Sequence, residues 1–180
     1  MFFPYRSLSV LAGLSALSLA LAGCTSMAHA PSLNLTCSEK WVILPMENFT
    51  ETPHAAQAAE TLAENVLRSQ GIGEVTQYPS GLADSLAEFG TVSQKYAKAL
   101  DWARGQEAHY GLSGSVTEWR YKSGTEGEPV AGMTLRIIDI ETGKSVWTTG
   151  GSRTGWDRDA ITGVGQKLIR KLLGAAFIRC

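Results

Sequence analysis

The chain has 180 residues, with 16 lysines and arginines against 17 aspartates and glutamates and a formal net charge of −1 at neutral pH. This near-neutral balance excludes the strongly basic surface that nucleic-acid binding requires. The length is enough for one globular domain with its own core.

The first residues are typical of a bacterial secretory signal. A single cation, Arg6, precedes a run of Leu, Ala and Ser over residues 8–22, and small residues end the run. The run is shorter than the ~20 residues that a membrane-spanning helix needs, which disfavours a plain transmembrane anchor. We therefore predict a signal peptide over residues 1–23.

The end of this segment, Leu21-Ala22-Gly23-Cys24, resembles a bacterial lipobox. In that motif the cysteine is acylated and becomes the first residue of the mature chain. The resemblance implies a covalent lipid on Cys24, followed by a short tether over residues 24–38. Thr25 favours the outer membrane, because lipoproteins kept in the inner membrane often carry Asp after the cysteine.

Residues 39–180 are expected to form a single α/β domain. The apolar run at 41–45 predicts a buried strand. Thr52 is an expected N-cap with Pro53 at the first helical position, and apolar residues then recur at helical spacing to about Gln70. A short strand follows at 74–78, and residues 80–90 could form a loose turn or a short helix.

The rest of the chain predicts a helix, three strands and a last helix. Gly111 and Gly114 in the first of these strands suggest bulges or close backbone approach. Gly143 suits a hairpin turn between the last two strands, and Asp157 or Asp159 is expected to open the last helix. The expected ranges are a helix at 92–105, strands at 108–121, 130–140 and 145–150, and a helix past 157.

The predicted fold is therefore an α/β sandwich in the order β-α-β-α-β-β-β-α. It has about three helices and a mixed sheet of about five strands, and the C-terminal half of the sheet is antiparallel.

The cysteines left after lipidation are Cys37 and Cys180. An even pair in an oxidising compartment predicts a disulfide between them, and two free thiols are the alternative.

No convincing active site is present. Gly111-Leu-Ser-Gly-Ser115 lacks the final glycine of a nucleophile elbow, and it falls inside a predicted strand. The histidines, at 29, 54 and 109, lack metal-ligand spacing. We expect no enzyme activity, no metal site and no cofactor.

One tryptophan lies in an unusual place. Trp156 follows Gly155 in a polar segment at 152–158, flanked by Arg153 and Arg158. An indole beside cations suits a membrane interface with anionic lipid, so we predict that these three residues contact the membrane. The alternative is a tryptophan folded back over the last helix.

Two segments resemble the PelC family of exopolysaccharide export. They are Gly114 to Pro129, with its Trp-Arg-Tyr-Lys-Ser-Gly run at 119–124, and Val146 to Trp156, with its Arg-Thr-Gly-Trp loop. The hairpin alone is shared with CsgG-like and LpoB-like lipoproteins and with the N-terminal domain of TolB. The likeness is strongest over residues 105–173.

The resemblance implies a non-enzymatic lipoprotein on the periplasmic face of the outer membrane. PelC-like proteins form a dodecameric ring that guides a cationic amino-sugar polysaccharide to the PelB porin for biofilm export. The membrane-facing tryptophan of the family matches Trp156. The electronegative face of the family suggests Glu118, Glu126 and Glu128 as polymer-guiding residues, with ordinary solvated carboxylates as the alternative.

A ring needs head-to-tail contacts between two different surfaces of each copy. Trp102, Trp119 and Tyr121 are candidate anchors for such contacts, and each could equally belong to the core. Two other functions remain open: an LpoB-like regulator of a periplasmic synthase and a CsgG-like secretion component. An LpoB-like regulator usually has a longer tether than residues 24–38 provide.

Overall fold

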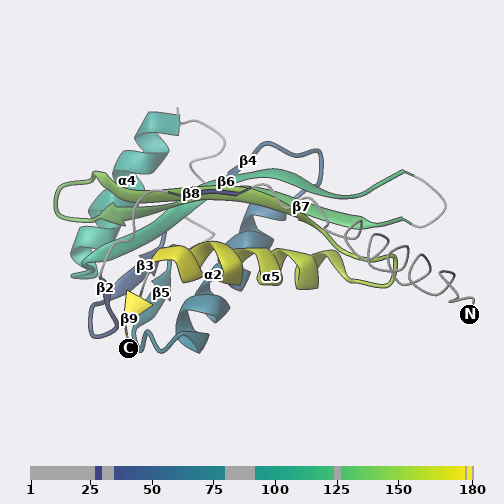
Figure 1. Cartoon of the computed structure of the whole chain (residues 1–180). Coiled ribbons are helices and arrows are strands. Elements are labelled where there is room, and N and C mark those ends of the chain that lie inside the picture. The colour runs from purple at the N-terminus through teal and green to yellow at the C-terminus, as the bar shows by residue number, and fades with distance from the viewer. Residues whose placement is uncertain (1–26, 30–34, 80–91, 124–126, 177, 180) are drawn as a thin grey trace, which may run out of the picture.

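The computed structural model describes residues 27–29, 35–79, 92–123, 127–176 and 178–179 (Figure 1). The α/β class and the predicted order of helices and long strands are confirmed, and short elements are added around them. The elements are β1 (Met27–His29), β2 (Leu35–Thr36), β3 (Trp41–Ile43), β4 (Glu47–Asn48), α2 (Ala55–Ser69), β5 (Val75–Gln77), α4 (Val92–Gly105), β6 (Tyr110–Tyr121), β7 (Pro129–Asp139), β8 (Ser145–Thr154), α5 (Ile161–Leu173), η1 (Gly174–Ala176) and β9 (Ile178–Arg179).

The main sheet has the strand order β1-β8-β7-β6-β3-β5, and β4 also pairs with β6. Strand β3 is parallel to β5 and to β6, whereas β6, β7, β8 and β1 are antiparallel in turn. The antiparallel C-terminal half is therefore confirmed. The predicted segment at 80–90 lies outside the described residues.

Helices cover the two faces of this sheet unequally (Figure 1). Helices α2 and α5 lie side by side on one face and close the larger core, which includes Trp41, Ile43 and Trp147. Helix α4 covers one end of the other face, over a smaller cluster that includes Val42 and Ile138. Successive residues of β3 thus enter opposite cores, which is why this strand is apolar throughout.

Pro45 interrupts the pairing of the chain with β6 between β3 and β4. Leu44 still donates its N–H to Leu112, and β4 resumes the parallel pairing at Glu47. Between them, the hydroxyl of Ser113 donates to the carbonyl of Pro45 at 3.1 Å, and the N–H of Met46 donates to Glu60 Oε1 at 2.7 Å. Side chains therefore replace the backbone partners that the break removes.

The predicted start of α2 is wrong by a few residues. The helix begins at Ala55 and its N-cap is His54, which has a φ of 60° and makes no side-chain cap. Thr52 instead donates its hydroxyl to the carbonyl of Trp119 in β6. A bond to a distant strand has replaced the local cap that the sequence suggested.

The start of α5 also differs from the prediction. Its N-cap is Ala160, and neither Asp157 nor Asp159 opens the helix. The strand before it is longer than expected, since β8 continues to Thr154. Residues 152–154 of the predicted loop are therefore part of the sheet.

The two glycines of β6 allow close approach, as expected. A Cβ at Gly114 would collide with the carbonyl oxygen of Thr134, and one at Gly111 would lie 2.8 Å from Leu44 Cδ1. The bulge of this strand lies elsewhere, between Val116 and Glu118.

The N-terminal part of the described chain pairs with the domain. Strand β1 is antiparallel to β8, and β2 is parallel to β9. Two short parts of the segment predicted as a tether are thus strands. Cys37, directly after β2, is disulfide-bonded. Its predicted partner, Cys180, lies outside the described residues, but the pairing of β2 with β9 brings Thr36 opposite Arg179.

Candidate functional site

Trp156 lies on a short connection between β8 and α5, and its side chain is 77% exposed. The connection is held by its own backbone: Gly155 donates to the carbonyl of Pro129 at 2.8 Å, and Asp159 donates to that of Trp156 at 2.9 Å. The carboxylate of Asp159 accepts the N–H of Trp156 at 3.2 Å. The indole is therefore presented to solvent by a fixed turn, and it is not folded over α5.

A second exposed aromatic lies at the same end of the molecule. Tyr121, the last residue of β6, is 51% exposed, and its hydroxyl accepts the N–H of Ile161 at 3.2 Å. This contact joins the end of β6 to the start of α5, next to the Trp156 connection. We call Tyr121 and Trp156 the aromatic end.

The two arginines predicted beside Trp156 differ in their surroundings. Arg158 is exposed on the same connection. Arg153 belongs to β8 and lies opposite Ala131, whose side chain is in the core under α2 and α5. Arg153 is half-buried, and within the described residues its Nε has no hydrogen-bond partner. Arg158 is therefore the more solvent-exposed of the two cations.

Cys24 lies outside the described residues, and β1 is the first described element after it. Met27 pairs with Gly151 and His29 with Thr149. Because the two strands are antiparallel, the chain enters β1 from the Thr154 end of β8, which leads to Trp156. The first described residue, Met27, therefore lies on the side of the β1–β8 pair that leads to the aromatic end. Three residues of extended chain span at most about 11 Å.

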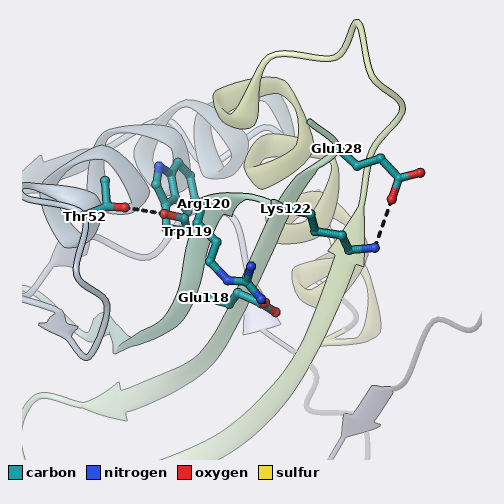
Figure 2. Close-up of polar contacts among 6 residues, drawn as sticks. All are labelled: Thr52, Glu118, Trp119, Arg120, Lys122 and Glu128. Atoms are coloured by element: carbon teal, nitrogen blue, oxygen red, sulfur yellow. Dashed lines mark hydrogen bonds and ion pairs between the residues drawn. The ribbon is translucent and has the colours of Figure 1, made fainter. Parts of the chain in front are cut away.

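The predicted acidic residues have cationic neighbours (Figure 2). Glu118 Oε1 lies 2.8 Å from an Arg120 nitrogen, and Glu128 Oε2 lies 3.0 Å from Lys122 Nζ. Glu126 lies outside the described residues. The two described carboxylates therefore present compensated charge, and their role toward a polymer stays a prediction.

The three candidate ring anchors occupy different environments. Trp119 is buried, with its ring against Gly165 of α5. Trp102 is half-buried and packs edge-on against Tyr78, with 5.1 Å between ring centroids. Tyr121 is the one of the three that is exposed.

The described residues contain no group of three or more His, Cys, Asp or Glu side chains that could hold a metal ion. Nor does any described helix combine the length and the hydrophobicity needed to cross a bilayer.

The sequence did not predict a groove that lies on the sheet face beside α4. It includes Phe49, Lys95, Tyr96 and Arg136, and Phe49 is 66% exposed. Phe49, α4 and Arg136 are far apart in the sequence, so no local spacing unites them. An isolated phenylalanine in the polar stretch Glu47 to Glu51 was the one available signal.

Together, the fold and the aromatic end define a class of protein: an α/β domain built on one large mixed sheet, with an exposed tryptophan between its last long strand and its last helix. A lipoprotein, GNA1162 from Neisseria meningitidis, shares the fold, with a TM-score of 0.52 at 13% identity over 76% of this chain and 96% of that one. No family model and no curated protein sequence matches the chain.

Two solved structures are much more similar. Both are PelC dodecamers from Paraburkholderia phytofirmans, and each match covers 87% of this chain and 100% of the other. One is 39% identical with a TM-score of 0.73, and the other, a point variant, is 38% identical with a TM-score of 0.74. The chain belongs to the PelC family.

Proposed function

We propose that this chain is a non-enzymatic outer-membrane lipoprotein of exopolysaccharide export. It assembles with copies of itself into a ring on the periplasmic face of the membrane. The ring guides a cationic amino-sugar polymer to a PelB-like porin. The observation that carries the proposal is 39% identity over 87% of the chain to a protein that forms a dodecamer.

The arrangement of β1 supports membrane attachment at the aromatic end. A lipid on Cys24 would enter the bilayer within about 11 Å of the β1–β8 pair, beside Trp156 and Arg158. An indole at the headgroup boundary and a cation near anionic lipid add to the acyl chains. The lipid and the tryptophan would then orient the domain together.

This geometry also favours the export ring over an LpoB-like regulator. A regulator that reaches a distant synthase needs a long free linker. Here only residues 24–26 separate the proposed lipid from β1, so the domain lies against the membrane.

Lipidation is tested by expressing the full chain in a Gram-negative host with an alkyne-labelled palmitate. We expect the label on the wild-type chain, recovery in the outer-membrane fraction, and loss of both in Cys24→Ser. A Cys24→Ser chain that still partitions into membranes at high salt would contradict the lipid anchor.

The tryptophan contact is tested on the chain without its lipid, by flotation with liposomes that contain anionic lipid. Trp156→Ala should weaken binding about tenfold or more, since burying a large apolar side chain contributes ~1.5–3 kcal/mol. Trp156→Phe should retain most of the binding. Equal binding by wild type and Trp156→Ala would contradict the membrane contact.

The oligomer is tested by native mass spectrometry of the acylated protein in detergent. We expect one closed species of many copies. A monomer at all concentrations would contradict the ring, whatever the lipid does.

A further inference from the structure

The groove beside α4 has a shape and chemistry that neither the lipid nor the aromatic end uses. Met46 to Phe49 form one wall, the first half of α4 forms the other, and β6 and β7 form the floor. Its volume is about 670 Å³. Among the described helices, α4 covers one end of this sheet face (Figure 1).

The groove combines exposed aromatic rings with cations. Phe49 is 66% exposed and Tyr96 36%, and they are two of the few large apolar side chains that the described residues expose. Lys95 on α4, Arg136 on β7 and one carboxylate, Glu47, also line it, so its cations outnumber its anions by one. No carboxylate of the described residues forms an ion pair with either cation.

A complementary surface lies past the other end of α4. The turn after α4 carries Glu107, and the β7–β8 turn carries Glu141. Arg104 joins the turns, since its Nε donates to the carbonyl of Ile140 at 3.2 Å. Both glutamates are exposed, and neither forms an ion pair within the described chain. Val146, near the start of β8, is 40% exposed. We call these residues the acidic tip.

We propose that the acidic tip of one copy docks into the α4 groove of the next copy, with Glu107 and Glu141 facing Lys95 and Arg136. The inference rests on the self-assembly in the proposed function and names the surfaces that make it. Aromatic rings at the centre of an interface supply binding energy, and complementary charges fix the register.

The positions of the two surfaces suit a ring. A head-to-tail contact needs two different patches that one copy can use at the same time. Lys95 and Arg104 are nine residues apart on one helix, which is about 14 Å along its axis. A copy can therefore give its tip to one neighbour and its groove to the other.

The charges also argue against the proposed cargo as the occupant of the groove. A cationic polymer would be repelled by Lys95 and Arg136, whereas carboxylates of a second copy would be attracted. The groove is therefore a contact between subunits and not a polymer path.

The test is charge reversal, read by native mass spectrometry of the acylated chain in detergent. Lys95→Glu with Arg136→Glu should raise the concentration for half-assembly at least tenfold, and Glu107→Lys with Glu141→Lys should do the same. All four substitutions together should restore assembly. The matched control, Arg170→Glu with Lys171→Glu on exposed positions of α5, should assemble like the wild type.

A second measurement uses the unmodified chain. Carbodiimide cross-linking of mixed light and heavy isotope copies should join Lys95 of one copy to Glu107 or Glu141 of another. Thermal melts of each variant establish that it is folded.

The outcomes separate this inference from the proposed function. If the wild type assembles and the reversed variants assemble equally well, or if the four-substitution variant stays dissociated, the docking is wrong while the ring stands. If the wild type never assembles, the ring itself is wrong, and the docking with it.

Discussion

Glu60 is the buried carboxylate on which the break between β3 and β4 depends. Its Oε1 accepts the N–H of Met46 at 2.7 Å, and its Oε2 accepts Gln77 Nε2 at 3.2 Å. Burial raises the pKa of Glu60 from 4.5, and the two hydrogen bonds oppose this shift. The residue therefore gives a backbone donor its partner, but its ionised form is poorly solvated.

This residue predicts a definite pH dependence of stability. Because the native pKa of Glu60 lies above the unfolded value, its contribution to the free energy of unfolding is full below pH 4.5 and falls as pH rises through the native pKa. Glu60→Gln should abolish that fall and keep the acceptor for Met46. Chemical denaturation of both proteins from pH 4 to 8 should show Glu60→Gln becoming more stable relative to the wild type as pH rises, and a constant or falling relative stability contradicts the prediction.

Glu60→Ala gives the complementary result. It leaves the Met46 N–H without its acceptor, so its free energy of unfolding should lie about 1–3 kcal/mol below that of Glu60→Gln at any pH in that range. An alanine variant as stable as the glutamine variant would show that water replaces the carboxylate.

At the scale of elements, the close packing of α5 on the sheet depends on one glycine, Gly165. A Cβ at Gly165 would collide with the ring of Trp119, and its atom Cζ3 would lie only 2.7 Å away. Gly163 in the same helix has nothing within 4 Å of its Cβ position. The sequence offers two glycines two residues apart, and only packing distinguishes them.

These two glycines make a matched pair of variants. Gly165→Ala should lower the free energy of unfolding by about 1–3 kcal/mol through overpacking against Trp119. Gly163→Ala should raise it by about 0.5–1 kcal/mol, because alanine loses less backbone entropy in a helix. Thermal melts of both variants measure these two changes in stability. Equal effects of the two substitutions would contradict the predicted difference in packing.

At the scale of the whole molecule, both ends of the described chain are attached to the domain. Strand β1 continues the main sheet beside β8, and β2 pairs with β9 next to the disulfide of Cys37. The pairing of β1 with β8 would hold the proposed lipid on Cys24 near the fold. A free tether could not do so.

The disulfide is expected to join Cys37 to Cys180. In the chain-entropy model, a loop of this length contributes at most about 4–5 kcal/mol. Cys37→Ser with Cys180→Ser should lower the midpoint of thermal unfolding, and reductant should lower that of the wild type but not of the double variant. Alkylation of both thiols in the wild type without reductant would contradict the bridge.

The sequence by itself determined the order and class of the long elements, because apolar spacing records which faces are buried. It predicted a lipobox, whose residues are contiguous, and it placed Trp156 on a polar connection. The Trp-Arg-Tyr-Lys-Ser-Gly run and the Arg-Thr-Gly-Trp loop likewise indicated the resemblance to the PelC family.

Only the tertiary structure decided where those features lie relative to one another. Thr52 does not cap α2 and instead donates its hydroxyl to the carbonyl of Trp119. Glu118 pairs with Arg120 along the strand, and Glu128 pairs with Lys122 across the hairpin. Strand β1 paired with β8 so that its first residue, Met27, lies on the Thr154 side, and distant elements formed the α4 groove. Local periodicity records burial, whereas partners far along the chain are set by how the sheet pairs and by what the helices leave uncovered.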